Sequence, residues 1–248
     1  MTGIEIRPCR TIEEMDACVA VQAEVWGFQS SDIVPRRMFV VASKIGGQVI
    51  GAFDGSNLAG FAMAIPGVRG GSPYLHSHML AVREGYRDAG LGKRLKFFQR
   101  DEALSRGITL MEWTFDPLEL KNAFLNIRKL GAIMRRYTRS FYGITTSTLQ
   151  AGLPTDRLHA EWWLNSARVE SFVAGSPPVS TTERYVVVPA EVAKWKQNAE
   201  TRGKARDLQM RIADQLESAF SEGLAIVGFR RESTGDGVYE LGTVPEKL

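Results

Sequence analysis

The stretch that decides the fold runs from Leu80 to Leu95 and reads LAVREGYRDAGLGKRL. Apolar residues ending at Val82 predict a strand, and the apolar spacing that follows predicts a helix over Gly90–Arg106. The first turn of a helix offers N–H groups without intrahelical partners, at the positive end of the helix dipole. Gly90 and Gly92 would let an anion approach the backbone closely, because neither carries a Cβ. This junction therefore predicts a binding site for a phosphate group.

Positive charge surrounds the same junction, and two familiar phosphate motifs can be tested against it. Arg87, Lys93 and Arg94 would each add positive charge near a bound anion. A P-loop needs Gly in place of Arg87 and a hydroxyl residue in place of Arg94, and a dinucleotide fingerprint needs a third Gly in place of Leu95. Both motifs therefore fail. A third interpretation stays open, in which Gly90-Leu91-Gly92 only opens a helix.

The elements around this junction follow an order that predicts a mixed sheet. The expected strands are Ile4–Ile6, Gln48–Phe53, Leu58–Ile65, Tyr74–Val82, Thr109–Phe115 and Ala132–Tyr137. The expected helices are Thr11–Trp26, Pro35–Ala42, Gly90–Arg106 and Leu120–Leu130. The order β, α, α, β, β, β, α, β, α, β places helices on the faces of a mixed sheet and does not fit a strict βαβ series.

Local signals mark several ends of these elements. Thr11, with Glu14 three residues later, predicts a capping box. Asp54-Gly55 between two apolar runs predicts a β-hairpin, and Gly131 predicts the end of a helix. Pro66–Pro73 is rich in Gly and is expected to be a mobile loop.

The pattern after Tyr142 is weaker. We expect strands over Leu158–Leu164 and Tyr185–Val188, one long charged helix over Pro189–Ser221, and a closing pair of strands, Ala225–Phe229 and Val238–Leu241. An apolar stripe on the long helix predicts packing or the seam of a homodimer. The domain prediction is a core over residues 1–142 and an extension over residues 143–248, which completes the sheet or forms a second lobe.

The motif Arg87-x-x-Gly90-x-Gly92 resembles motif A of the GNAT N-acetyltransferase superfamily, Arg/Gln-x-x-Gly-x-Gly/Ala. The order of elements up to about Tyr137 is similar to the GNAT order, and the segment Asn122–Ala132 resembles the helix after the fifth strand of that family. Within the superfamily, the runs Trp113–Leu118 and Thr155–Leu158 resemble a group of predicted acetyltransferases with a C-terminal extension. The resemblance implies an α/β fold with a mostly antiparallel sheet flanked by helices.

The resemblance also implies an acyl-CoA-dependent N-acyltransferase in which a small amine attacks the thioester directly. The cofactor pyrophosphate would lie on the loop and the first helical turn: Arg87, Asp88, Ala89, Gly90, Leu91, Gly92 and Lys93. The strands Tyr74–Val82 and Thr109–Phe115 would splay to admit the pantetheine arm, and backbone at Leu80, Ala81 and Val82 would polarise the thioester carbonyl. Many members carry a Tyr that protonates the leaving thiolate, but Ile127 stands at that position here.

An amine nucleophile must lose a proton, so a base that titrates near neutrality is expected. His76 and His78 lie two residues apart on one strand and share a face, and His78 is favoured because it is nearer the expected thioester. Either could instead be a hydrogen-bonded pocket histidine. A metal site is disfavoured, because His159 is far away in the sequence and no Cys-x-x-Cys motif is present.

Other polar residues near this strand pair are further candidates. Glu112 and Asp116 are alternative bases, and Asp116 could orient the substrate ammonium or simply cap the turn before Pro117. Asn122 and Asn126, one helical turn apart, could hydrogen-bond the pantetheine amides or be solvated.

The chemistry of the donor and acceptor stays open. Acetyl-CoA is the donor that the resemblance implies first, but Arg69, Arg135 and Arg136 could bind the carboxylate of a succinyl group or of the substrate. A small amine, with an amino acid favoured, is the expected acceptor. A non-catalytic CoA-binding module is the alternative, and Ile127 at the usual Tyr position suggests it.

Composition narrows the setting. The net charge is +3 and the positive residues are not clustered, which disfavours a nucleic-acid partner. Cys9 and Cys18 cannot form a disulfide framework, so a reducing compartment is favoured. Met1–Arg10 shows no signal peptide, and no stretch reaches the ~20 apolar residues of a membrane span. A cytoplasmic enzyme without a membrane partner is therefore expected.

Overall fold

The computed structural model of the protein describes residues 3–87, 89–143, 145, 150–179 and 181–244. The described residues fall into two compact units, the first ending at Glu112 and the second beginning at Trp113. Strand β5 (Leu110–Phe115) passes from one unit into the other.

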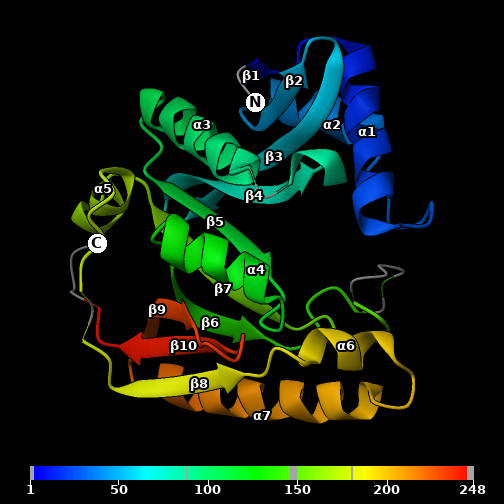
Figure 1. The fold of residues 1–248 in the computed structure, drawn as a ribbon. Helices are drawn as coiled ribbons and strands as arrows, with labels where there is room; N and C mark the ends of the chain where they lie inside the picture. The colour runs from blue at the N-terminus through cyan, green and yellow to red at the C-terminus, as the bar shows by residue number, and fades with distance from the viewer. Residues whose placement is uncertain (1–2, 88, 144, 146–149, 180, 245–248) are drawn as a thin grey trace. The chain divides into compact units, whose positions relative to one another are not determined.

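The first unit is built around five strands with helices on both faces. Its other strands are β1 (Ile4–Pro8), β2 (Gln48–Asp54), β3 (Asn57–Arg69) and β4 (Ser72–Val82), and its helices are α1 (Ile12–Trp26), α2 (Arg36–Lys44) and α3 (Leu91–Ser105). The strand order is β1-β2-β3-β4-β5 (Figure 1). All neighbours pair antiparallel except β4 and β5, which are parallel.

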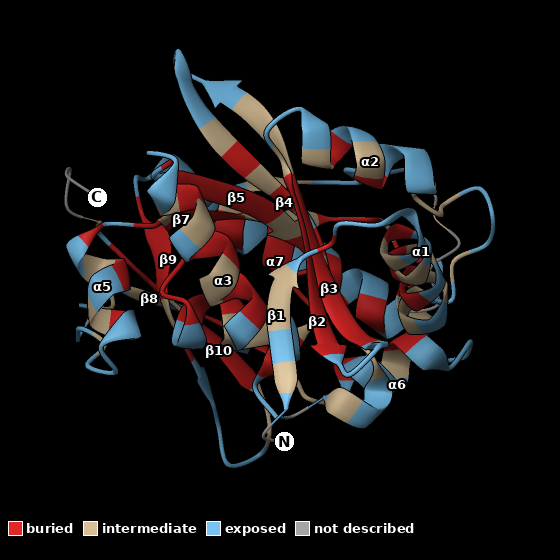
Figure 2. Ribbon diagram, turned by 90° about the horizontal axis from the view of Figure 1, so that it is seen from above, coloured by how far each residue is buried: buried red, intermediate tan, exposed pale blue. Residues whose placement is uncertain are grey.

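Two apolar layers hold the helices on this sheet. On one face α1 and α2 pack through residues such as Val21 and Phe39 against Phe61 of β3. On the other face α3 packs through Leu91 and Leu95 against β2 and β3. The strands β2 and β3 lie between the two layers and are buried along most of their length (Figure 2). The capping box at Thr11 is confirmed, because its side chain accepts from the Glu14 N–H while the Glu14 carboxylate accepts from the Thr11 N–H.

The prediction of a mobile loop over Pro66–Pro73 is wrong, because this segment is the end of a long hairpin. Strand β3 continues to Arg69, β4 begins at Ser72, and the turn between them consists of Gly70 and Gly71. Both glycines have positive φ, 57° and 80°, which the tight turn of a two-residue hairpin requires.

The second unit contains the end of β5 and five further strands, which pair antiparallel with one another. Its strands are β6 (Ile133–Thr138), β7 (Arg157–Trp163), β8 (Arg184–Val188), β9 (Ala225–Arg231) and β10 (Gly237–Gly242). They lie in the order β7-β6-β9-β10-β8. Its helices are α4 (Leu120–Ala123), α5 (Ala167–Val173), α6 (Val192–Gln197) and α7 (Arg202–Ser221), and the apolar stripe of α7 is packed inside this unit through Leu208, Ile212 and Leu216.

Three details of the second unit differ from the sequence-based expectation. The long helix over Pro189–Ser221 is two helices, which separate at Asn198–Thr201. The helix predicted over Leu120–Leu130 changes after Ala123 into a π-helical stretch, in which the Leu130 N–H donates to the Leu125 carbonyl at 3.0 Å. Helix α5 was not expected; it begins at Ser166, whose hydroxyl accepts from the Val169 N–H.

The fold class is confirmed, since both units are mixed α/β structures with mostly antiparallel strands flanked by helices. Among the residues that the structure describes, no helix is long and apolar enough to cross a membrane.

Candidate acyl-CoA site

Strand β4 carries a β-bulge at the histidine pair. Ala64 of β3 pairs with Ser77, and Met63 pairs with Met79, so His78 is the extra residue between the two pairs. A bulge bends the strand and redirects the groups on it, and bulges are frequent beside active sites. The rings of His76 and His78 remain neighbours, with their centroids 6.2 Å apart.

The two edges of β4 behave differently beyond the bulge. On the β3 side the pairing continues to Val82, which lies opposite Gly60. On the β5 side it joins Leu75 to Met111 and His76 to Glu112, and within the described residues it extends no further. The later residues of β4, including Leu80, Ala81 and Val82, therefore present backbone groups that β5 does not take up.

The loop after β4 leads into the start of helix α3. A 3₁₀ turn (Glu84–Tyr86) is followed by Arg87, Ala89 and Gly90, all exposed. Gly90 has φ +74°, and a Cβ at this position would meet no atom within 4 Å. Among the described residues, no side chain caps α3, whose first N–H groups belong to Leu91, Gly92 and Lys93. Asp88, the remaining predicted residue of the loop, lies outside the described residues.

The basic residues around the loop have different partners. The Nε–H group of Arg87 donates to the Val82 carbonyl at 3.1 Å, which holds this guanidinium at the end of β4. Lys93 lies over the Phe97 ring at 4.9 Å. Arg94 instead donates to the Ile4 carbonyl on β1 at 2.9 Å, so its charge is engaged away from the loop. Of the three predicted cations, Arg87 and Lys93 fit the predicted phosphate site best.

A cluster of ionisable side chains lies where β4 and β5 pair. Glu112 is buried, lies opposite His76 in the parallel register, and forms an ion pair with Arg69 at the end of β3. His78 keeps an exposed face, but the protein around it limits hydration of the charged ring and lowers its pKa below the usual 6.5. His78 is therefore neutral at pH 7 and can accept a proton.

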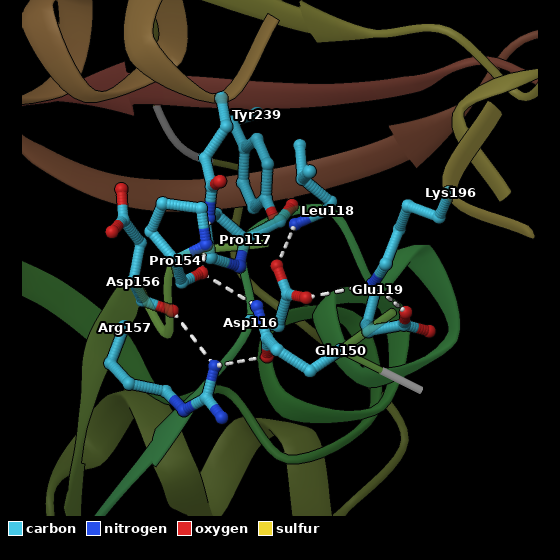
Figure 3. Close-up of polar contacts among 11 residues, drawn as sticks. Asp116, Pro117, Leu118, Glu119, Gln150, Pro154, Asp156, Arg157, Lys196 and Tyr239 are labelled. Carbon is cyan, nitrogen blue, oxygen red and sulfur yellow. Dashed lines mark hydrogen bonds and ion pairs between the residues drawn. The ribbon is translucent and has the colours of Figure 1, made fainter. Parts of the chain in front are cut away.

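Asp116 has structural partners for both carboxylate oxygens (Figure 3). Its Oδ1 accepts from the Leu118 N–H at 2.8 Å, and its Oδ2 lies 2.9 Å from Nζ of Lys196. Both Asp116 and Lys196 are buried. These contacts favour the turn-capping role for Asp116 over the catalytic role, so the proposed mechanism does not use it.

The two asparagines of the helix after β5 differ in their exposure to solvent. Asn122 is exposed, whereas Asn126 is only 4% exposed and lies in the π-helical stretch. The two residues therefore do not form one polar surface. Ile127, at the position where the resemblance implies a Tyr, is 1% exposed and is part of the apolar core.

A cavity of about 530 Å³ in the first unit lies elsewhere, between the start of α1, helix α2 and strand β2. It contains none of the predicted site residues. No group of three or more His, Cys, Asp or Glu side chains that could hold a metal ion occurs in the part of the chain that the structure describes.

Comparison with known proteins agrees with the loop and the strand order. Residues 15–124 match the model of the acetyltransferase (GNAT) family. This part of the chain is a GNAT acetyltransferase domain. The match includes β4, the loop and α3. No curated protein matches the sequence.

Solved structures of acetyltransferases have a fold similar to that of this chain, at low sequence identity. The protein yncA from Salmonella typhimurium, solved with its cofactor acetyl-CoA, has a TM-score of 0.54 and 16% identity, covering 66% of this chain and 96% of that chain. The ribosomal-protein-S18-alanine N-acetyltransferase from Escherichia coli has a TM-score of 0.52 and 16% identity, over 66% of this chain and 96% of that chain. Aminoglycoside 6'-acetyltransferase type Ii has a TM-score of 0.52 and 18% identity, over 65% and 98%.

Sequence reasoning missed a set of buried polar residues in the GNAT domain: Ser77, Lys96 and Gln99. Their residue types resemble those of any solvated helix face, and no spacing rule marks them. Only the packing of α3 on β4 brings them together.

Proposed function

We propose that the protein is an acyl-CoA-dependent N-acyltransferase that acylates a small amine. One observation carries the proposal. Within the described residues, a strand whose pairing with β5 stops at His76 leads through an exposed glycine-containing loop into a helix start that no side chain caps. This combination offers free backbone groups along an extended acyl arm and N–H donors for the phosphates.

In this proposal the chain's own residues have separate tasks. The N–H groups at the start of α3 bind the pyrophosphate, and Arg87 adds a charge-assisted contact. The backbone of Leu80–Val82 lines the pantetheine arm. The bulge at His78 redirects the backbone toward the carbonyl oxygen on which negative charge develops.

His78 is the proposed base, and the reaction needs no covalent enzyme intermediate. His78 takes a proton from the acceptor ammonium, and the amine nitrogen bonds to the acyl carbon. The carbon–sulfur bond then breaks to release CoA as a thiolate, and the nitrogen loses its second proton to solvent to leave the neutral amide. Glu112, fixed by Arg69, lies beside the neighbouring His76 and is the alternative base. Position 127 supplies no acid for the thiolate, because it is a buried isoleucine, and solvent can protonate the thiolate instead.

The ion pairs of the three candidate arginines favour acetyl over succinyl as the donor group. Arg69 is paired with Glu112, and Arg135 and Arg136 both lie within salt-bridge distance of Glu161. A second carboxylate would have to displace one of these pairs. We retain a small amine, with an amino acid favoured, as the acceptor, and cytoplasm as the location.

We also propose that residues 143–248 complete the fold around the core formed by residues 1–142. Strand β6 from the core segment pairs with β7 on one edge and with β9 on the other, and both partners come from the extension. An extension that supplies both neighbours of a strand is better described as part of the sheet than as a detached lobe.

Thermal unfolding with saturating acetyl-CoA tests the proposal. Ligand at about 100 times its Kd should stabilise the native protein by about 2.7 kcal/mol, and free CoA should also raise the midpoint. Arg87→Ala should weaken CoA binding by roughly 10-fold, the loss of about 1.4 kcal/mol expected for one charge-assisted contact. Arg94→Ala is the matched control and should bind CoA like the wild type, because Arg94 contacts β1.

Two results separate the candidate functions. No stabilisation of the wild type by either ligand would reject the loop as a CoA site. Stabilisation without CoA release from acetyl-CoA, over a broad panel of amines, would favour the non-catalytic module that the buried Ile127 suggests.

A further inference from the structure

A chain of buried polar side chains joins α3 to β4 next to the bulge. Nζ of Lys96 donates to Oγ of Ser77 at 2.7 Å, and this hydroxyl donates to Oε1 of Gln99 at 3.0 Å. The three residues are only 2%, 4% and 0% exposed. Lys96 and Gln99 are three residues apart on α3, so they project from the same side of the helix and hold Ser77 between them.

The same row of hydrogen-bonded side chains also contacts β2 and β5. The side chain of Gln48 on β2 donates to the Gln99 carbonyl at 2.9 Å and also to the Glu102 carboxylate. Nζ of Lys96 lies 4.0 Å from the sulfur of Met111, in the first of the two residue pairs that join β4 and β5. These polar side chains therefore connect α3 to the place where β4 pairs with β5.

A contribution to folding stability does not explain why these polar side chains are buried. Oε1 of Gln48 and Nε2 of Gln99 are buried and have no hydrogen-bond partner in the described part of the chain. Burial also lowers the pKa of the Lys96 ammonium well below 10.5, so the folded protein disfavours the charged form. Buried polar groups with imperfect partners are often no more stabilising than apolar side chains of the same shape. Such groups concentrate where function requires a particular geometry.

The hydrogen bonds among these buried side chains fix the position of α3 along β4, and the proposed reaction depends on that position. Ser77 is the last paired residue before His78, and Lys96 lies in the second turn of the helix whose first turn would bind the pyrophosphate. The spacing between the phosphate site and the bulge depends on how α3 is fixed along β4. An error of about 1 Å in such a spacing can lower the rate by roughly 100-fold.

We propose that Lys96, Ser77 and Gln99 are positioning residues that lock α3 to β4 and so set the distance between the phosphate-binding helix start and His78. This inference rests on the proposed acyltransferase function. The three residues act through the backbone that they hold, and they do not contact the reacting atoms.

Three measurements on Lys96→Met and Ser77→Ala test the inference: kcat, the Kd of free CoA and the unfolding midpoint. Each variant should lower kcat by roughly 10- to 100-fold. The Kd of free CoA should stay within about twofold, because the phosphate-binding N–H groups remain. Lys96→Met should unfold at the wild-type temperature or above it, since the desolvated amine is gone.

A purely structural role predicts the opposite combination. If kcat of both variants stays within about twofold of the wild type while the midpoint falls, the residues only fill the core and the inference is wrong. Ser43→Ala is the matched control, because its hydroxyl bonds only to the Val40 carbonyl of its own helix among the contacts in the described chain, and it should keep full activity. Failure of the proposed function itself is distinguishable, since the wild type would then show no transfer.

Discussion

Replacing Lys196 by alanine is expected to lower the free energy of unfolding by about 3–5 kcal/mol, the usual effect of removing one partner of a buried ion pair. Nζ of Lys196 lies 2.9 Å from Asp116 and 2.7 Å from Glu119. Its side chain is 3% exposed and that of Asp116 is 7% exposed. Without the ammonium, the Asp116 carboxylate would be left in the interior without its cation.

The balance of effects on Lys196 supports this expectation. Burial lowers the pKa of the ammonium, but Asp116 and Glu119 outweigh burial and raise the pKa above 10.5. The contribution to stability is therefore fully present below pH 10.5 and is lost as the pH rises through the folded-state pKa. At neutral pH the full loss should appear in the alanine variant.

The ion pair also anchors the turn that follows β5. Lys196 belongs to α6, whereas Asp116 precedes Pro117, whose carbonyl accepts from the hydroxyl of Tyr239 at 2.7 Å (Figure 3). A helix and a strand of the second unit thus converge on one turn. Loss of Lys196 should weaken this turn as well as leave a buried charge.

Urea unfolding at pH 7 measures the effect. Lys204→Ala, an exposed position on α7, is the matched control and should change stability by less than about 0.5 kcal/mol. The double variant Asp116→Asn/Lys196→Met should recover part of the loss, because no charge of this pair remains. A loss below about 1 kcal/mol in Lys196→Ala would mean that Asp116 reaches water or another donor once the lysine is gone.

Signals that act over a few residues were read correctly from the sequence. The capping box at Thr11 and the left-handed Gly131 depend on neighbours within one helical turn, and the structure confirms both. The signal for the predicted phosphate loop is equally local, because a helix start and its glycines are adjacent in the chain, and this loop stays a prediction. The resemblance to the GNAT family rests largely on this stretch. The match of residues 15–124 to the family model confirms that resemblance.

Features that depend on distant partners could not be read in this way. The segment Pro66–Pro73 resembles a loop in composition, yet the antiparallel partner β4 extends it into a hairpin. Gly67 is there because the ring of Tyr74 lies 2.5 Å from where a Cβ would be, which no single strand reveals. The burial of Lys96 is likewise a product of how α3 lies on β4, since the next residue along a helix from a core leucine is often solvated.

The bulge at His78 is an important part of the candidate site, and it could not be predicted from the sequence. Alternation along Tyr74–Val82 predicts a regular strand, and the register shift appears only when β3 is placed beside β4. The choice of His78 over His76 therefore had only proximity in its favour at first. The bulge and the lowered pKa of the ring both motivate the proposal that His78 is the base.

Replacing His78 by alanine is expected to lower kcat by about 10²–10⁴, the range for loss of a positioned general base. Because burial lowers the pKa of His78 below 6.5, the acidic limb of the wild-type kcat/KM should have its midpoint below pH 6.5. The variant should lose this acidic limb. Added imidazole should restore part of its activity, because a small base can occupy the space that the ring leaves.

Folding stability gives a readout of the same ring that does not involve catalysis. With a folded-state pKa below 6.5, the native protein binds fewer protons at His78 than the unfolded chain does. Stability from this residue is therefore lost as the pH falls below 6.5, and His78→Gln should remove that dependence. The comparison checks that the ring titrates where the activity profile requires.

His159→Gln is the matched control for the kinetic test. Its ring nitrogen is 2.9 Å from the Thr138 hydroxyl, and burial lowers its pKa to about 4, so it also stays neutral at pH 7. It should keep the wild-type kcat and the same acidic limb. If His78→Ala retains more than about half of the wild-type kcat, the base is another group, and Glu112→Gln is then expected to show the large loss instead, because Glu112 lies opposite His76 in the same pair of strands.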